Sequence, residues 1–267
     1  MKAEDLYSVA GKVVVITGGA NGLGFAMARA MTDNGARVVI VDVDDDAATR
    51  AVEELTARGG TARSEIANLA DGPTLRAVFD RIVAQDGVID AVFANAGVTA
   101  GPGYLTPFGK RDPAGAIENI PNDLWEGVLG VNLHGVFKTI QAAVPHMKKR
   151  GRGHIVVTTS TAASKTSPAV GTPYVVTKAA VAHLVRQLAL ELARFNITVN
   201  AIQPGPFQTR ISTPELVAVF EASSPSHRVG KPEEIEGLAL FFASDASSFV
   251  TGAQYNIDGG RLLNPAD

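Results

Sequence analysis

The sequence contains no cysteine, which excludes disulfide bonds, thiolate metal sites and cysteine nucleophiles. Its five histidines have no metal-ligand spacing, and a net charge of −3 gives no reason to expect a nucleic-acid partner. No apolar run approaches the roughly 18 residues of a membrane span, and the N-terminus carries no secretory signal. Gly-x-Ser-x-Gly and Walker-type motifs are also missing, which argues against hydrolases and kinases. We therefore expect a soluble, cytoplasmic protein that binds no metal, membrane or nucleic acid.

Of the 267 residues, 46% are apolar and 19% are charged, so the chain can bury a core and is not expected to be disordered. A chain of this length is within the range of one large α/β domain. We expect a single domain over residues 1–267, with two small domains as the alternative.

Two kinds of apolar segment alternate along the chain. Short, nearly continuous β-branched blocks predict strands buried on both faces, at residues 13–17, 37–41, 91–94, 155–159 and 197–202. Helical spacing predicts helices in other segments, at residues 47–58, 75–85, 124–149 and 174–195. This order predicts an α/β fold: a doubly wound parallel sheet with helices on both faces. Ligands of such sheets bind beyond the carboxyl ends of the strands.

Glycine and proline gather in two long loops. Residues 98–121 are too long for a simple connection, so we expect a functional or disordered insert there. The second loop spans residues 203–231, and its part from 206 to 231 is the expected substrate loop region. A short helical piece is predicted within it at residues 216–221.

A glycine-rich turn follows the first predicted strand and opens a helix. Gly18, Gly22 and Gly24 allow the backbone to turn sharply and to approach a pyrophosphate at the helix N-terminus. Asp42 ends the next strand, 18 positions after Gly24. A carboxylate there accepts both ribose hydroxyls of an adenosine and repels a 2′-phosphate. The pattern therefore indicates a dinucleotide site that prefers NAD, although Asp42 as a mere helix cap is the alternative.

Tyr174 and Lys178 stand at i and i+4 on the last long predicted helix, so they share one face. A nearby ammonium favours the phenolate and is expected to lower the pKa of a tyrosine that transfers protons. Ser160 follows a predicted strand at the ligand-binding edge, where its hydroxyl can hold a substrate oxygen. Asn132 is a polar residue in an apolar helical segment, either a satisfied buried amide or part of a proton path.

These residues, taken together, resemble the short-chain dehydrogenases/reductases over about 240 residues. Further motifs fall in the order of that family: Asn95-Ala-Gly97, Pro204-Gly205 with Thr209, and Asp258-Gly-Gly260. The resemblance implies a Rossmann-type sheet of seven strands, a nicotinamide cofactor and a homotetramer packed through long helices such as 174–195. It also implies a catalytic group of Asn132, Ser160, Tyr174 and Lys178. The implied cofactor-binding residues are Gly18, Asn21, Gly22, Leu23, Gly24, Asp42, Val43, Asn68, Leu69, Asn95, Ala96, Gly97, Tyr174, Lys178, Pro204, Gly205, Phe207 and Thr209.

The chain departs from the family pattern at several positions. Ala94 stands where an asparagine is usual, and Asn68 stands where an aspartate often contacts the adenine. The interval from Ser160 to Tyr174 is 14 residues, one more than in many members, which leaves Thr159 and Thr161 as alternatives to Ser160. The insert at 98–121 is also longer than usual, and we expect it either to shape the substrate pocket or to contact another subunit.

We expect an NAD-dependent enzyme that transfers a hydride between nicotinamide and a secondary alcohol or ketone. The expected substrate has a hydrophobic or aromatic body, because the candidate pocket residues are mainly apolar. They are Val98, Ser164, Phe207 and Phe220, with Tyr104, Leu105 and Phe108 from the insert. The alternatives are a ketoacyl carrier-protein reductase using NADPH and a catalytically silent NAD-binding sensor.

Overall fold

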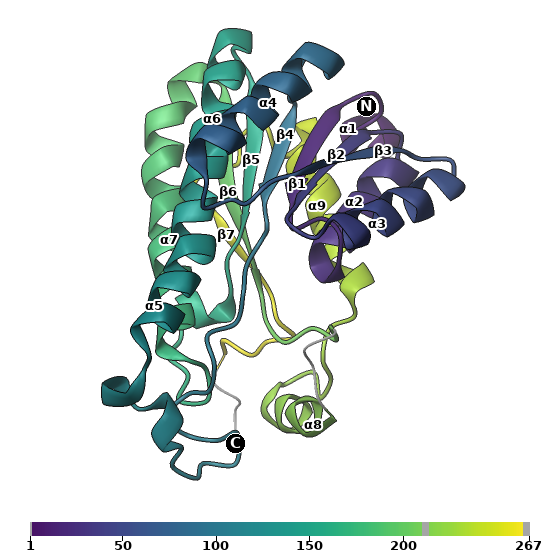
Figure 1. Cartoon of the computed structure of the whole chain (residues 1–267). Coiled ribbons are helices and arrows are strands. Elements are labelled where there is room, and N and C mark those ends of the chain that lie inside the picture. The colour runs from purple at the N-terminus through teal and green to yellow at the C-terminus, as the bar shows by residue number, and fades with distance from the viewer. Residues whose placement is uncertain (1, 210–213, 264–267) are drawn as a thin grey trace.

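The computed structural model describes residues 2–209 and 214–263, and its centre is a parallel sheet of seven strands. The strand order is β3-β2-β1-β4-β5-β6-β7, and this order makes it the doubly wound parallel sheet that was predicted (Figure 1). The strands are β1 (Val13–Thr17), β2 (Arg37–Asp42), β3 (Thr61–Ile66), β4 (Ala91–Ala94), β5 (Gly153–Thr158), β6 (Ile197–Pro204) and β7 (Gln254–Ile257). The order reverses between β1 and β4, and this switch point is where α/β sheets bind nucleotides.

Helices cover both faces of the sheet (Figure 1). One face carries α2 (Gly22–Asp33), α3 (Asp45–Ala57) and α9 (Glu236–Ala243). The other face carries α4 (Gly72–Asp86), α6 (Val136–Arg150) and α7 (Thr172–Leu192). Two shorter helices, α1 (Ala3–Leu6) and α5 (Asn122–Leu129), precede β1 and α6, and α8 (Pro214–Ser223) lies beyond the carboxyl ends of the strands. Among residues 2–209 and 214–263, the helices lack the combined length and hydrophobicity of a membrane span.

The residues explain why the central strands form. All five residues of β1 and all four of β4 are buried, because both of their faces pack under helices. The edge strands differ: β3 reads Thr-Ala-Arg-Ser-Glu-Ile and β7 reads Gln-Tyr-Asn-Ile. Their polar residues hid them from the apolar pattern, which therefore predicted only five of the seven strands.

The predicted helix at 124–149 is interrupted. The chain forms α5, then a π-helical turn at Gly130–Gly135, and then α6. Asn132 lies in this wider turn, and its side chain forms hydrogen bonds with the backbone of Val98. π-Helical turns occur frequently at functional sites.

The insert at 98–121 is more ordered than the sequence suggested. It contains 3₁₀ turns at Pro113–Gly115 and Ile117–Asn119, and a bridge joins Leu105 to Arg111. Its stem lies against the residues that precede α7, since the Leu105 N–H donates to the Pro168 carbonyl at 2.9 Å. A Cβ atom on Gly103 would lie 2.1 Å from that same carbonyl oxygen, so only glycine allows this contact.

Candidate functional site

The glycine turn joins the end of β1 to the N-terminus of α2. Gly18 and Gly22 have φ angles of +64° and +56°, a backbone conformation that residues other than glycine rarely adopt. A Cβ atom on Gly24 would lie 2.0 Å from the Gly18 carbonyl oxygen and 2.5 Å from Nδ2 of Asn95. The first turn of α2 therefore packs directly on its own loop, and its N-terminal N–H groups face the place that an anion would occupy.

Asp42 holds this turn from the end of β2. Its carboxylate accepts hydrogen bonds from the Ala20 N–H at 3.2 Å and from the Val43 N–H at 2.8 Å. The cap of α3 is instead Asp44, whose side chain accepts from the Ala47 N–H. The alternative role of Asp42 as a helix cap is therefore wrong.

Asn95 ties three central strands together at their carboxyl ends. Its Nδ2 donates to the carbonyls of Thr17 and Gly18, and its Oδ1 accepts from the Thr158 hydroxyl at 3.0 Å. The side chains at the ends of β1, β4 and β5 thus form one network. A Cβ atom on the nearby Gly97 would lie 3.3 Å from Oδ1 of Asn132 and 3.4 Å from Nζ of Lys178, which places all three residues together.

The side chain of Asn132 is a fully engaged, buried amide. Its Oδ1 accepts from the Val98 N–H at 2.8 Å, and its Nδ2 donates to the Val98 carbonyl at 2.9 Å. Of the two roles that the sequence left open, the satisfied amide is thus present. This pairing also fixes the point where the chain leaves β4 and enters the insert.

Ser160 follows β5 and caps the 3₁₀ turn at Thr161–Ala163, because its hydroxyl oxygen accepts from the Ala162 N–H at 3.1 Å. It also interacts with the hydroxyl of Tyr174, in the first turn of α7. Burial raises the pKa of Tyr174 above its ordinary value of 10, and the Ser160 hydroxyl opposes this rise. The expectation of a lowered tyrosine pKa is therefore wrong for this state of the protein, since burial outweighs the stabilisation of the phenolate.

Lys178 is buried beneath this pair. Its Nζ lies 5.6 Å from the centroid of the Tyr174 ring and donates to the Thr158 carbonyl at 2.9 Å. Burial lowers the pKa of Lys178 from 10.5 to about 8. The structure thus brings the four predicted catalytic residues to one edge of the sheet.

Other predicted cofactor residues follow the same edge. Asn21, Leu23 and Ala96 belong to the glycine turn and to the segment after β4, and Val43 lies exposed just after Asp42. After β3, Leu69 is buried while Asn68 is exposed and accepts from the Ala70 N–H. Gly205 follows β6, and a Cβ atom there would lie 2.7 Å from the Cβ atom of Asp258. Pro204 is the last residue of β6, and Thr209 is the last residue described before the gap at 210–213.

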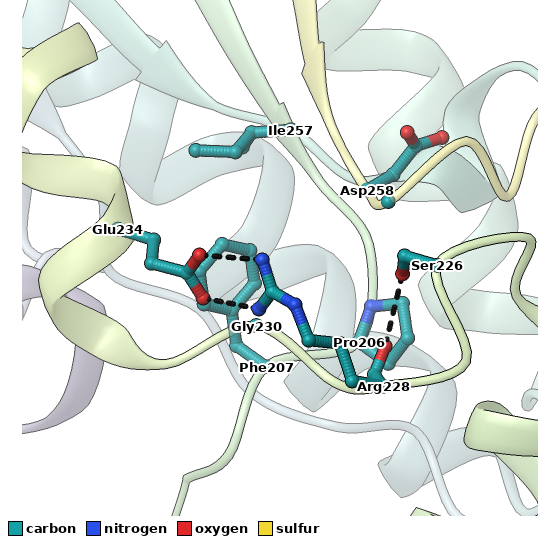
Figure 2. Close-up of a pocket in the computed structure, with 9 residues that line it drawn as sticks. Pro206, Phe207, Ser226, Arg228, Gly230, Glu234, Ile257 and Asp258 are labelled. Carbon is teal, nitrogen blue, oxygen red and sulfur yellow. Dashed lines mark hydrogen bonds and ion pairs between the residues drawn. The ribbon is translucent and has the colours of Figure 1, made fainter.

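The predicted substrate residues are less uniform. Val98 is partly exposed beside Asn132, and Phe220 on α8 faces the guanidinium of Arg261 at 4.8 Å. Phe207 is only 8% exposed, and its ring packs on Gly230. Figure 2 shows it lining a pocket with Arg228 and Glu234, whose side chains pair with each other. That placement gives no support to Phe207 as a substrate contact.

Gln203 of β6 is a site residue that the sequence did not predict. Its Nε2 donates to the Ser164 hydroxyl at 2.7 Å. Ser164, which the sequence predicted to contact the substrate, therefore already has a hydrogen-bond partner inside the protein. Because β6 also contains Thr198 and Asn200, its sequence does not single out Gln203. In residues 2–209 and 214–263 no cluster of histidine, aspartate or glutamate could hold a metal ion.

Comparisons with known proteins agree with this geometry. A family model described as enoyl-(acyl carrier protein) reductase matches residues 18–261. The 5-keto-D-gluconate 5-reductase of Escherichia coli (strain K12) is 36% identical and covers 97% of this chain and 99% of its own. The dehydrogenase/reductase SDR family member 4 of Bos taurus is 32% identical, over 94% of this chain and 87% of its own.

Two solved structures are similar over nearly the whole chain. One is a gluconate 5-dehydrogenase from Burkholderia cenocepacia J2315 in complex with NADP and tartrate, with a TM-score of 0.86, 32% identity and coverage of 97% of this chain and 98% of that one. The other is a 3-oxoacyl-[acyl-carrier protein] reductase from Brucella melitensis with bound NAD, with a TM-score of 0.86, 34% identity and coverage of 98% and 97%. The chain therefore belongs to the short-chain dehydrogenase/reductase family of nicotinamide-dependent oxidoreductases.

Proposed function

We propose that this protein interconverts a secondary alcohol and a ketone, with Tyr174 as the residue that transfers the proton. The observation that carries this proposal is the buried Lys178 ammonium 5.6 Å from the centroid of the Tyr174 ring, with Ser160 following the strand whose end holds that ammonium. The two hydroxyls would hold the substrate oxygen and stabilise the negative charge that develops on it. The Lys178 ammonium, 5.6 Å from the ring, favours the phenolate that accepts a proton during alcohol oxidation.

The residues present fit a dinucleotide. The glycine turn would hold its pyrophosphate, since no side chain at Gly24 could coexist with the Gly18 carbonyl. Lys178 and Asn95-Ala-Gly97 lie where the nicotinamide half would bind, and that group when bound supplies hydride chemistry.

We propose NAD as the preferred cofactor. Asp42 ends β2 with its carboxylate beside the glycine turn, where it would accept the ribose hydroxyls and repel a 2′-phosphate. The exposed Asp44, Asp45 and Asp46 add negative charge to the same region. Relatives with bound NADP and with bound NAD both occur, so the family alone does not decide between them.

The substrate class has two sources of support that differ. Val98, Phe220 and Tyr104 favour a hydrophobic or aromatic body, whereas a relative is named for the sugar acid 5-keto-D-gluconate. A ketoacyl carrier-protein reductase using NADPH is the second candidate: a similar 3-oxoacyl-[acyl-carrier protein] reductase structure favours its substrate class, although that structure has bound NAD. Asp42 argues against its phosphorylated cofactor. The complete set of catalytic side chains argues against a silent sensor.

Turnover with NAD over a panel of secondary alcohols, sugar acids and acyl thioesters tests the proposal. We expect NAD-linked oxidation of at least one alcohol and loss of that activity in Tyr174→Phe, which keeps the ring and removes the hydroxyl. A panel without turnover despite measurable NAD binding would favour the sensor. Preferential reduction of acyl thioesters with NADPH would favour the ketoacyl reductase.

We also propose one domain and a homotetramer. A single sheet with helices on both faces supports the single domain over residues 1–267. An apolar groove of about 300 Å³ between α6 and α7, lined by Phe137, Val144 and Leu188, supports subunit packing through these helices. A monomer in light scattering would contradict the tetramer. Cytoplasmic location stays a prediction from the sequence.

A further inference from the structure

The segment that carries Ser160 is attached to β6 on both sides of the serine. Before it, the Thr159 N–H and hydroxyl both donate to the Ile202 carbonyl, at 2.9 and 3.1 Å. After it, the Ser164 hydroxyl accepts from Nε2 of Gln203 at 2.7 Å. Two consecutive residues of β6 therefore hold the two ends of a segment of six residues.

The short turn between these two attachments is hydrogen-bonded both to Ser160 and to Ser164. The Ser160 hydroxyl accepts from the Ala162 N–H, and its carbonyl accepts from the Ala163 N–H at 2.8 Å. Ser164 closes the same turn, since its N–H donates to the Thr161 carbonyl at 3.1 Å. Displacement of Ser164 would thus move the groups that orient the Ser160 hydroxyl.

Gln203 is suited to this task because it is rigid. It is 1% exposed, and its backbone, near the carboxyl end of β6, pairs with Asn256 of β7. A buried amide without a partner is destabilising, so the hydrogen bond to Ser164 is favoured over an open arrangement. Ser164, by contrast, is exposed.

We propose that Gln203 is a positioning residue for the reaction: through Ser164 it holds the Ser160 hydroxyl at the distance from Tyr174 that proton transfer requires. This inference rests on the proposed function for its catalytic meaning, but the mechanical coupling is independent of it. It also assigns Ser164 to the scaffold of the site and not to the substrate.

Hydrogen exchange tests the coupling without any substrate. In Gln203→Met, which keeps the length of the side chain and removes its polar atoms, we expect faster exchange at the amides of Ala162, Ala163 and Ser164. Thr198→Val is the matched control, because it removes a buried hydrogen bond to His154 at the opposite end of the same strand. Unchanged exchange in Gln203→Met, or equal acceleration in Thr198→Val, would overturn the proposal.

Steady-state kinetics provide a second test of the positioning role of Gln203. Misplacing a reacting group by about 1 Å can cost about 100-fold in rate, so we expect kcat of Gln203→Met to fall about tenfold or more. Because the Ser160 hydroxyl lowers the pKa of Tyr174, the apparent pKa of alcohol oxidation should move upward, while NAD affinity stays unchanged. Ser164→Ala should reproduce both effects, and the double variant should be no worse than either single one.

The outcomes separate this inference from the proposed function. Wild-type turnover with an unchanged kcat and pH profile in Gln203→Met would overturn the positioning role and leave the function standing. A wild type without turnover would refute the function, while the exchange data would still decide whether Gln203 holds the turn. Additive losses in the double variant would overturn the route through Ser164.

Discussion

Lys178 Nζ donates a hydrogen bond of 2.9 Å to the carbonyl oxygen of Thr158, the last residue of β5. The strand that ends just before Ser160 thereby holds the ammonium carried by α7. This position destabilises the charged lysine, because burial disfavours the ammonium and lowers the pKa of Lys178 to about 8. Function and stability thus make opposite demands on one side chain.

Lys178→Met should separate these demands. The unfolded chain keeps the lysine proton up to pH 10.5 and the native protein loses it above about 8, so wild-type stability should rise across this interval. The rise should amount to about 3 kcal/mol and be absent in the variant, whose kcat should fall about 100-fold. Urea unfolding at several pH values measures the first effect, and equal slopes in both proteins would contradict it.

Asp42→Ala tests the cofactor preference. We expect NAD affinity to fall about tenfold or more, since a hydrogen bond to a charged group contributes roughly 1.5–3 kcal/mol. NADP affinity should rise because the repulsive charge is gone. Glu53→Ala, an exposed acid further along α3, is the control and should change the ratio little. Titrations of both nucleotides provide the measurement, and tighter NADP binding by the wild type would refute the NAD preference.

Gly24→Ala should damage the dinucleotide site. The added methyl group would lie 2.0 Å from the Gly18 carbonyl, so the turn must open and stability should fall by about 1–3 kcal/mol, together with NAD affinity. In α5, Gly127→Ala meets no atom within 4 Å and should leave the protein unchanged or slightly more stable. Thermal unfolding with and without NAD compares the two, and similar behaviour of both variants would be inconsistent with the packing described.

His154 should make the protein sensitive to acid. It is 8% exposed and bonds the Thr198 hydroxyl, and burial lowers its pKa to about 4. The unfolded chain binds this proton below about 6.5, so stability is lost as the pH falls from 6.5 to 4, by about 3 kcal/mol. His154→Gln should lose less stability over this range in urea unfolding. An identical loss in the variant would assign the acid sensitivity to other groups.

Gly103→Ala tests the packing of the insert. Its methyl group would collide with the Pro168 carbonyl, and we expect a loss of about 1–3 kcal/mol in unfolding free energy. Phe108→Ala at the tip, where the side chain is 75% exposed, should change stability by less than about 0.5 kcal/mol. A neutral Gly103→Ala would mean that the insert does not depend on its contact with the residues before α7.

The sequence predicted the parts of this fold that depend on local patterns. The bounds of β1 and β4 match because continuous apolar runs reflect burial on both faces. The break at Asn132 escaped prediction, because it depends on a partner in another segment, the backbone of Val98. Helical spacing extends through a π-helical turn as easily as through an α-helix.

In the candidate site, too, the features set by local sequence spacing were predicted, and those set by contacts between distant segments were not. The i, i+4 spacing of Tyr174 and Lys178 placed both on one face of α7. Their ionisation did not follow from that spacing, because the burial that raises one pKa and lowers the other comes from packing across strands. The bond from Gln203 to Ser164 joins residues 39 positions apart and has no signature in the sequence.

The most direct test of the central claim is label transfer from a secondary alcohol deuterated at its carbinol carbon. Mass spectrometry of the nicotinamide after a single turnover would follow the label, with Tyr174→Phe as the matched variant. We predict deuterium in the reduced cofactor with the wild type and almost none with the variant. Cofactor without label in the wild type, or equal labelling by both proteins, would contradict the account.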